Sequence, residues 1–553
     1  MNLWTNNTLV SAILAILFSG PLNADTLVHN INGYSISDTG LQQFTAMSYD
    51  EQGKVVTTFT QAPQTDGYSQ TIDGNGATLL PGLIDAHGHV SSIGKAIATV
   101  DVVGVKSEQQ AAQRVSLFLD NNSNKDWLWG RGWNQVLWPS KNFPNKSSLD
   151  AISGDVAVAL NRIDGHALWV NSKALALAGI DKSTSDPAGG QILRDKQGEA
   201  TGVLIDNAMD LVFNVIPKST VTELELDIKT ALTFLASKGL TSVHDAGSSA
   251  LDIQAMQNLR AQNAMQARIY AMLDVLDPAN DATLANGIAL DPQQLLDIRS
   301  VKISADGALG SRGAAMARDY SDKKGHRGLL LLSDADLQHH MARAMAAGYQ
   351  VNAHAIGDLA NTKVLNNFEQ LQSLPVRQLQ RHRVEHAQIV NPKDLPRFVD
   401  LAVIASIQPT HATSDKNMAA DRIGKKRLKG AYAWRTLIES GAAVAGGSDF
   451  PVEPANPFYG LHAAVTRQSR DNQPLDGWMP EQKISREAAL DMFTRGAAYA
   501  AHQDKTIGQI APGYWADFIL VSDDYFTVKA DDIWRNKVLQ TYVAGQQVYS
   551  SEK

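Results

Sequence analysis

Between residues 82 and 449, short apolar runs alternate with amphipathic stretches of helical length. This alternation is typical of βα units that build a parallel sheet, and it restricts the chain to few fold classes. Eight runs have strand length, at residues 82–88, 239–246, 268–275, 299–305, 349–355, 382–387, 402–408 and 442–449. Eight such units favour an α/β fold with a closed (β/α)8 barrel of the TIM type over an open sheet.

The segments between these runs carry helix signals. Ser333 is placed to cap a helix over residues 334–347, which has acidic residues in its first turn and is followed by Gly348. Further helices are expected at about 358–372 and 431–440. Helices therefore fall between the strands, as a barrel of βα units requires.

One gap between strands is much longer than the others. The first run ends at residue 88 and the second begins at residue 239, so the barrel is expected to carry a large insertion at about residues 105–220. Four of the ten tryptophans of the chain lie in it, at positions 127, 129, 133 and 138. They could pack inside the insertion or contribute to an apolar substrate pocket, and the sequence leaves both explanations open.

Both ends of the chain are rich in short β-type runs separated by Asn, Asp and Gly. We therefore expect residues 25–80 and 505–553 to form one small β-sandwich domain. The barrel and its insertion would then occupy residues 81–504, and residues 1–24 would be a signal peptide.

The composition limits which residues can act as nucleophiles or bind a metal. The chain has no cysteine, which excludes thiolate nucleophiles and cysteine-bound metals, so any metal must be held by histidine, carboxylate or a modified lysine. The net charge is −8 and no basic block occurs, which argues against nucleic-acid binding.

Potential metal ligands stand at the carboxyl ends of five predicted strands. In a barrel these ends meet on one face, where catalytic residues converge. Residues i and i+2 of a strand point to the same side, so His87 and His89 can face one site. The full set is His87, His89, Lys302, His354, His386 and Asp449.

Each of these residues also has an ordinary structural explanation. A single histidine on an apolar strand is commonly a hydrogen-bonded core residue, a buried lysine is commonly ion-paired, and an aspartate after a strand commonly caps the next helix. Packing does not readily explain why six such residues stand at the same end of five strands. The ordered set therefore predicts a metal site.

The residues around these ligands resemble the amidohydrolase superfamily, and in particular its amidohydrolase-3 branch, which includes N-substituted formamide deformylase-like proteins. The similar segments are residues 85–89 (DAHGH), 301–314 (VKISADGALGSRGA), 354–358 (HAIGD), 385–388 (EHAQ) and 447–452 (GSDFPV). The resemblance covers nearly everything after the first 24 residues.

The resemblance implies a role for each ligand. His87 and His89 would hold one divalent metal, zinc being the expected ion, and His354 and His386 would hold a second. Lys302 matches a lysine that is carbamylated in many relatives and bridges two metals. Asp449 would bind metal and exchange protons with the attacking water. The branches differ in metal count, so one or two ions are expected.

Further residues are candidates for contact with the substrate. His166 could reach the substrate carbonyl as a catalytic residue, or it could make a loop hydrogen bond. Asp306 and Arg312 could order the loop after Lys302 or bind substrate. Gln408 and His411 follow the seventh predicted strand and could line the pocket.

These observations favour a metal-dependent hydrolase that cleaves a non-peptide C–N bond, most simply a linear amide, of a small molecule. Ester or lactone hydrolysis is an alternative, because the same chemistry permits it. A non-catalytic regulatory protein on an amidohydrolase scaffold is another. The chain is expected to bind no nucleic acid and to keep no membrane anchor after cleavage, and a homo-oligomer is a further expectation.

The first 24 residues suggest export to the periplasm or the medium. Residues 9–18 (LVSAILAILF) are apolar but shorter than the roughly 20 residues that span a bilayer. Their length suits the apolar region of a signal peptide, and Ala24 offers a small residue for cleavage. A buried N-terminal strand or helix is the alternative.

We therefore predict that the exported protein begins near Asp25. Mass spectrometry of protein recovered from the periplasm or the medium should find this new N-terminus. Protein that keeps Met1 and is recovered only from the cytoplasm would contradict export.

Overall fold

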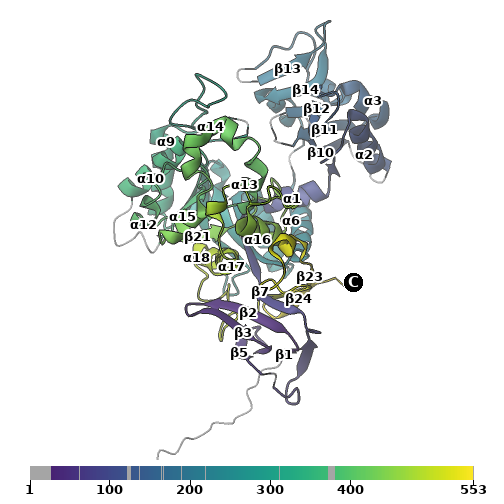
Figure 1. Cartoon of the computed structure of the whole chain (residues 1–553). Helices are drawn as coiled ribbons and strands as arrows, with labels where there is room; N and C mark the ends of the chain where they lie inside the picture. The colour runs from purple at the N-terminus through teal and green to yellow at the C-terminus, as the bar shows by residue number, and fades with distance from the viewer. Residues whose placement is uncertain are drawn as a thin grey trace, which may run out of the picture.

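The computed structural model describes residues 26–61, 63–120, 126–135, 138–163, 165, 167–187, 190–217, 219–310, 312–371 and 380–551. The predicted signal peptide and His166 lie outside these residues. In Figure 1 a barrel forms the middle of the molecule, with a β-sandwich below it and a separate lobe above it.

The barrel consists of eight strands that pair in parallel with their neighbours in the order β21-β20-β19-β18-β17-β16-β15-β8. They are β8 (Leu83–Gly88), β15 (Leu240–Ser248), β16 (Arg268–Asp274), β17 (Leu296–Ser304), β18 (Gln350–Ala355), β19 (Arg383–His386), β20 (Ile404–Ile407) and β21 (Val444–Gly446). Each overlaps one predicted strand, and the predicted barrel is confirmed.

Polar contacts close the barrel between β21 and β8. Asp85 accepts hydrogen bonds from the Ser448 backbone N–H at 2.9 Å and from the Ser448 hydroxyl at 2.6 Å. The Asp449 N–H donates to the His87 carbonyl at 2.7 Å. A Cβ atom on Gly447 would lie 2.7 Å from the Asp85 carboxylate, so this close approach requires glycine. The seam thereby places the turn that contains Asp449 directly beside His87.

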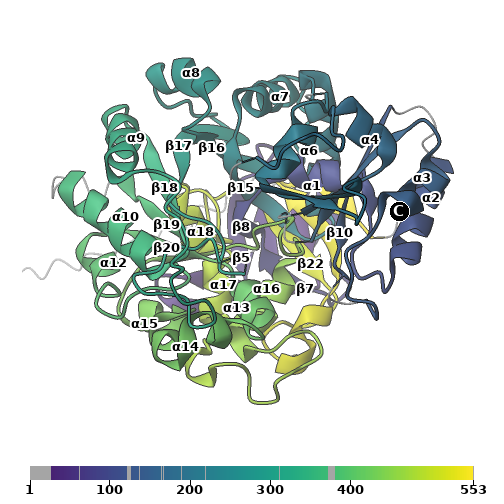
Figure 2. The ribbon, with the colours of Figure 1, turned by 90° about the horizontal axis from the view of Figure 1, so that it is seen from above.

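Helices surround the strands, as Figure 2 shows from above. The principal ones are α1 (Val90–Ile97), α6 (Val221–Ala236), α7 (Ala250–Ala261), α9 (Asp334–Ala346), α10 (Asp358–Leu371), α13 (Pro409–Asp415), α15 (Trp434–Glu439), α17 (Arg486–Met492) and α18 (Arg495–Ala500). The side chain of Ser333 caps α9 by accepting from the Asp336 N–H, as the sequence predicts. Because helices cover the outer face, all eight strands are largely buried.

The two ends of the chain meet in a β-sandwich. One sheet joins β7 (Thr78–Pro81), β2 (Asn32–Ser37) and β3 (Gly40–Phe44) to β22 (Phe518–Val521), β23 (Val538–Val543) and β24 (Gln546–Ser550). The other contains β1 (Thr26–His29), β4 (Ala46–Tyr49), β5 (Val55–Phe59) and β6 (Gln70–Asp73). Phe518 and Tyr542 stack in the core between the sheets, with ring centroids 4.3 Å apart. The predicted sandwich of both ends is confirmed.

The insertion forms its own lobe, which we call the insertion lobe. Its mixed sheet has the order β13-β14-β12-β11-β10-β9, built from β9 (Val100–Asp101), β10 (Trp127–Trp133), β11 (Ala157–Arg162), β12 (Ala167–Val170), β13 (Gly190–Arg194) and β14 (Ala200–Asp206). Helices α2 (Glu108–Asp120), α3 (Lys146–Ser153) and α4 (Ser172–Leu177) accompany it. Trp133 and Trp138 are buried in its core, which supports packing as their role, whereas Trp127 and Trp129 are half-buried.

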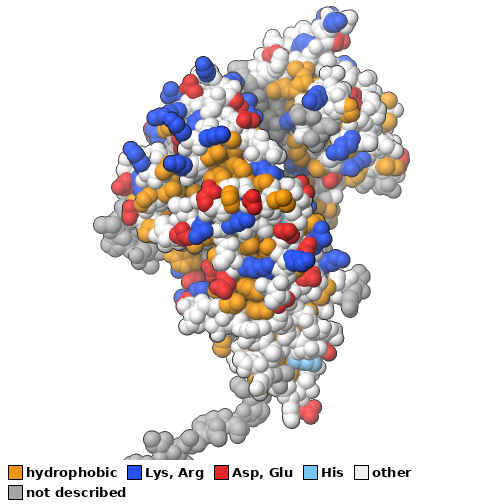
Figure 3. All heavy atoms as spheres, viewed as in Figure 1, with side chains coloured by type: hydrophobic (Ala, Val, Ile, Leu, Met, Phe, Trp, Pro, Cys, Tyr) orange, Lys and Arg blue, Asp and Glu red, His pale blue; other side chains and the backbone are white. Residues whose placement is uncertain are grey.

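Among the described residues, none of the helices has both the length and the apolar character needed to cross a membrane. On the face drawn in Figure 3, acidic and basic side chains are interspersed with apolar ones over the barrel helices.

One buried ion pair joins the barrel to the C-terminal strands. Arg268 begins β16, and Asp517 immediately precedes β22. The guanidinium donates two hydrogen bonds to the carboxylate, at 2.6 and 2.9 Å, and the side chains are 0% and 4% exposed. The carboxylate also accepts from the Ala544 N–H at 2.7 Å. The pair therefore ties the sandwich to the amino end of the barrel.

We predict that Asp517→Asn lowers the free energy of unfolding by about 3–5 kcal/mol, because it leaves the buried Arg268 without its counter-charge. Chemical denaturation of both proteins measures the difference. As a control, Glu439→Gln breaks the exposed pair with Arg435 and should change stability by no more than about 1 kcal/mol. Equal effects of the two substitutions would contradict this account.

Candidate metal centre

All six ligands predicted from the sequence lie at or just beyond the carboxyl ends of barrel strands. His87 lies in β8, Lys302 in β17 and His354 in β18, and His386 ends β19. His89 follows β8 and Asp449 follows β21 by three residues. The structure brings these side chains to one face of the barrel, where the parallel strands converge.

The carboxylate of Asp449 lies at the centre of this group. Its Oδ1 atom is 3.1 Å from His89 Nε2 and 3.5 Å from His87 Nε2. Its Oδ2 atom is 3.6 Å from His411 Nε2. Asp449 has φ 64°, a left-handed conformation that is uncommon for a residue with a Cβ atom. The fold therefore holds this carboxylate in an unfavourable backbone geometry among three imidazoles, which is typical of a functional site.

His87 is oriented by a residue to which the sequence assigned no role. Its Nδ1 atom lies 2.6 Å from Glu385 Oε2, and its Nε2 atom points toward Lys302 Nζ at 3.2 Å. A carboxylate on one ring nitrogen fixes the tautomer and leaves the other nitrogen available to a metal. Arg383 and Glu385 are two charged residues in a fully buried four-residue strand, a signal that could have identified the pair.

A side-chain amide orients His386. The Gln408 amide Oε1 lies 2.7 Å from His386 Nδ1, so Gln408 orients a predicted ligand.

The ring of His354 meets that of His386 edge-on, with centroids 4.4 Å apart. The Nε2 atom of His354 is buried, lies 3.5 Å from Asp306 Oδ1, and has no hydrogen-bond partner in the described part of the chain. A buried nitrogen without a partner is expected where a metal would bind.

Burial sets the charge of these groups. It lowers the pKa of His354 to about 3 and those of His87 and His386 well below their usual value, so the imidazoles are neutral, as metal ligands must be. Burial alone would raise the pKa of Asp449, but the hydrogen bond from His89 and the nearby histidines lower it. Burial also lowers the pKa of Lys302. Neutral imidazoles around an ionised carboxylate are a donor set that fits a divalent cation.

The remaining predicted residues divide into two groups. Gln408 and His411 belong to the cluster around His386 and Asp449. The Arg312 guanidinium instead donates to Asp322 at 3.1 and 2.9 Å, in the loop after β17, so its predicted contact with substrate stays a prediction. Asp306 orders this loop, because its carboxylate accepts from three backbone N–H groups, those of Ala315, Ile356 and Gly357.

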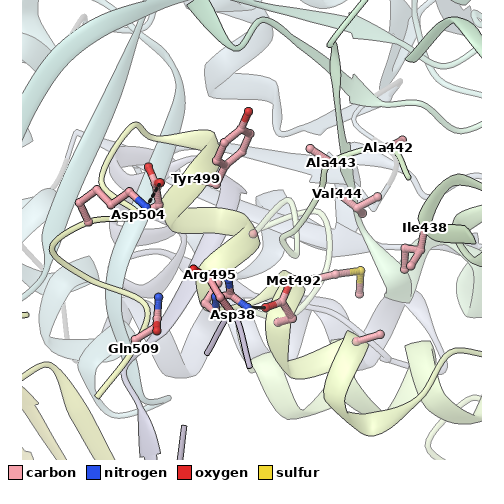
Figure 4. Close-up of a pocket in the computed structure, with 14 residues that line it drawn as sticks. Asp38, Ile438, Ala442, Ala443, Val444, Met492, Arg495, Tyr499, Asp504 and Gln509 are labelled. Carbon is pink, nitrogen blue, oxygen red and sulfur yellow. Dashed lines mark hydrogen bonds and ion pairs between the residues drawn. The ribbon is translucent and has the colours of Figure 1, made fainter. Parts of the chain in front are cut away.

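A cavity of about 400 Å³ lies elsewhere in the molecule, at the amino end of β21. Its wall includes Ala442, Val444, Met492, Arg495 and Tyr499, and Asp38 from the sandwich reaches its edge (Figure 4). The ligands lie at the opposite ends of the strands, so this cavity belongs to the junction between barrel and sandwich. The histidine cluster is therefore the candidate metal centre.

The barrel and its cluster of histidine and carboxylate ligands define a metal-dependent hydrolase of the (β/α)8 class. A family model described as "Amidohydrolase family" matches residues 70–549. The chain belongs to the amidohydrolase family.

Relatives along most of the chain agree with this assignment. The chain is 33% identical over 491 residues to a putative amidohydrolase, YtcJ, of Bacillus subtilis (strain 168), covering 87% of this chain and 90% of YtcJ. It is 33% identical over 489 residues to LONG AFTER FAR-RED 3 of Arabidopsis thaliana, with 86% and 82% covered. It is 26% identical over 498 residues to N-substituted formamide deformylase of Arthrobacter pascens, with 86% and 89% covered.

A solved structure supports the fold. An uncharacterized metal-dependent hydrolase from Pyrococcus horikoshii OT3 superposes with a TM-score of 0.76 at 26% identity, and the match covers 91% of this chain and 99% of the other. The agreement spans nearly the whole of both chains.

We predict that Glu385→Gln weakens metal binding by about 10- to 100-fold, because the amide is a poorer partner for the His87 Nδ1–H than the carboxylate. Titration of metal-free protein with Zn²⁺ measures the affinity. Glu439→Gln, on the surface of α15, should bind zinc as the wild type does. Equal affinities for all three proteins would contradict a role for Glu385.

Proposed function

We propose that this amidohydrolase cleaves a non-peptide C–N bond of a small molecule, most simply a linear amide such as an N-substituted formamide. The single observation that carries the proposal is the position of Asp449, whose carboxylate faces three imidazoles at the mouth of the barrel. The similarity to N-substituted formamide deformylase supports amides as the substrate class.

We propose zinc as the metal, in one or two ions, held by His87, His89, His354, His386 and Asp449. Such an ion supplies Lewis acidity and lowers the pKa of a water molecule toward about 7. Imidazole and carboxylate ligands suit zinc, and the absence of cysteine leaves no competing soft ligand.

Lys302 is proposed to be carbamylated. A neutral lysine amine that adds CO₂ and releases one proton becomes an anionic oxygen ligand, whereas an ammonium would repel a cation. Lys302 Nζ lies 3.2 Å from His87 Nε2, within the ligand cluster, where a carbamate could bridge two ions.

Asp449 is proposed to move the proton during hydrolysis. Its pKa is held below the usual value, so the carboxylate is ionised. As the general base it would accept a proton from the attacking water. The same carboxylate would then deliver that proton to the departing nitrogen. His166 remains a candidate for contact with the substrate carbonyl, and Arg312 for binding a more distant part of the substrate.

Two alternatives keep the same scaffold. Ester or lactone hydrolysis would use the same residues without the need to protonate a nitrogen. A non-catalytic regulatory role is suggested by the name of another relative, the exoenzymes regulatory protein AepA of Pectobacterium carotovorum subsp. carotovorum. The complete set of ligands favours catalysis, because a protein that only binds partners does not need an ionised aspartate among neutral imidazoles.

The proposed setting is the periplasm or the medium, with a small molecule as the partner of the site. No nucleic acid is proposed as a partner, and no membrane anchor would remain after cleavage. A homo-oligomer is proposed as the assembled form.

A panel experiment tests the function. Purified protein with measured zinc content is assayed on N-substituted formamides, other N-acyl amides, esters and lactones. The proposal expects amide turnover that is lost with chelation and restored by zinc. Turnover of esters or lactones alone would favour the first alternative, and no turnover by the zinc-loaded protein would favour the regulatory one.

We predict that Asp449→Asn lowers kcat by at least about 100-fold on the best amide of the panel, because the amide side chain keeps the shape but cannot accept the proton. Steady-state kinetics and the melting temperature are measured together. If Asp449 served only as a structural residue of its turn, the variant would have a lower melting temperature but a kcat per folded molecule near that of the wild type. That result would show that Asp449 does not take part in catalysis.

A further inference from the structure

One strand of the insertion lobe reaches the turn that contains Asp449. Arg131 lies in β10, and its Nη1 atom donates a hydrogen bond of 2.7 Å to the carbonyl of Pro451. The two residues are 320 positions apart in the chain, so this bond joins the lobe to the barrel. Pro451 comes two residues after Asp449, the predicted ligand at the seam that closes the barrel.

The same face of β10 makes a second contact with the barrel. Residues i and i+2 of a strand point to one side, so Trp129 lies on the same face as Arg131. The ammonium of Lys95 lies 5.5 Å from the centroid of the Trp129 ring, within the range of a cation–π contact. Lys95 belongs to α1, which starts directly after His89. The lobe therefore contacts the two segments that follow the predicted ligands His89 and Asp449.

The backbone around Arg131 is fixed within the lobe. The Arg131 carbonyl accepts a hydrogen bond from the Val102 N–H at 2.9 Å, where the chain leaves β9. The next residue, Gly132, has φ 110°, and a Cβ atom there would lie 2.6 Å from the backbone nitrogen of Val103. Glycine therefore lets β10 run close to this segment, and the starting point of the Arg131 side chain is held in place.

Arg131 keeps its charge although it is partly buried. Burial lowers the pKa of the guanidinium, and the carboxylate of Asp101, its register partner on β9, raises it. The usual pKa of arginine is above about 12, so the group stays protonated at neutral pH. Hydrogen bonds from a charged donor are stronger than those between neutral groups. The bond to Pro451 therefore stabilises the turn more than a neutral donor would.

The turn that accepts this bond depends on contacts from outside. The left-handed backbone of Asp449, at φ 64°, is unfavourable and persists only where the surrounding structure fixes it. The barrel holds the carbonyl of Phe450, which accepts from the His89 N–H at 2.9 Å. Arg131 holds the next carbonyl along the chain, that of Pro451, from the side of the lobe. Barrel and lobe thus hold consecutive peptide groups beside Asp449.

We propose that Arg131 is a positioning residue of the active site. Its guanidinium holds the Pro451 carbonyl and thereby keeps the Asp449 carboxylate facing the imidazoles. Arg131 acts through the turn, so the insertion lobe helps to set the geometry of the barrel mouth without contacting the reacting atoms. The effect on the turn is independent of the substrate, whereas the effect on turnover rests on the proposed function.

Hydrogen exchange of the metal-free full-length protein, followed by mass spectrometry, tests the effect on the turn. Arg131→Met keeps the bulk of the side chain but removes the donor, so peptides spanning residues 448–453 should exchange at least about 10-fold faster than in the wild type. Arg131→Lys keeps a charged donor and should recover part of the protection. If the methionine variant is unstable, Arg131→Ala repeats the test with a smaller side chain.

Arg114→Met is the matched control. Arg114 Nη1 donates to the carbonyls of Asp101 and Val103 at 3.1 and 3.0 Å, and both acceptors lie inside the lobe. This variant should leave the exchange of residues 448–453 at the wild-type rate. Faster exchange of the turn in Arg114→Met as well would indicate general damage to the lobe and overturn the proposal. Wild-type exchange of the turn in both Arg131→Met and Arg131→Ala would also overturn it.

Steady-state kinetics on the best amide of the panel tests the effect on turnover. Arg131→Met should lower kcat by about 10-fold or more and change KM by less than about 3-fold, because a displaced carboxylate impairs the reaction more than binding. Arg131→Lys should recover part of kcat. A change confined to KM would make Arg131 a substrate contact and overturn the positioning role. If the wild type hydrolyses no compound of the panel, the proposed function fails, and the exchange experiment still decides the role of Arg131.

Discussion

The contact between the turn after β21 and the end of β8 is the interaction on which the rest of the site depends. The Asp449 N–H donates to the His87 carbonyl, and Ser448 bonds to Asp85 from the same turn. These bonds close the barrel and, at the same point, set the carboxylate of Asp449 among the imidazoles. The same hydrogen bonds therefore close the barrel and position the cluster. A substitution that breaks them would affect both.

The charges beneath this seam explain why the cluster suits a cation. Glu385 is buried beside His87, and Arg383 Nη1 lies 3.8 Å from its other oxygen and 3.0 Å from His244 Nδ1. This arrangement fixes one nitrogen of His87 and leaves the other facing Lys302 Nζ and Asp449. A buried carboxylate surrounded by neutral imidazoles is poorly stabilised in an apolar barrel unless a positive charge joins it. A divalent ion held by these residues would supply that charge, and the stability of the site would then depend on the same ion as its chemistry.

The fold could be predicted from the sequence because it is encoded in local patterns: the length of the apolar strands, the residues that cap helices, and the long spacing between the first two strands, from residue 88 to residue 239. The meeting of His87, His89 and Asp449 also follows from strand order, since the carboxyl ends of parallel strands in a barrel converge. The contact of Glu385 with His87 and that of His411 with Asp449 did not follow. Both depend on distances across the barrel mouth and on where the first turn of α13 points, which no local pattern specifies.

The most direct test of this account is the anomalous scattering of a crystal of the purified protein, recorded on both sides of the zinc absorption edge. The account predicts a zinc peak within about 2.3 Å of ligand atoms of His87, His89 and Asp449. A fully folded barrel with no anomalous peak among these residues, or with zinc bound only elsewhere on the protein, would contradict it.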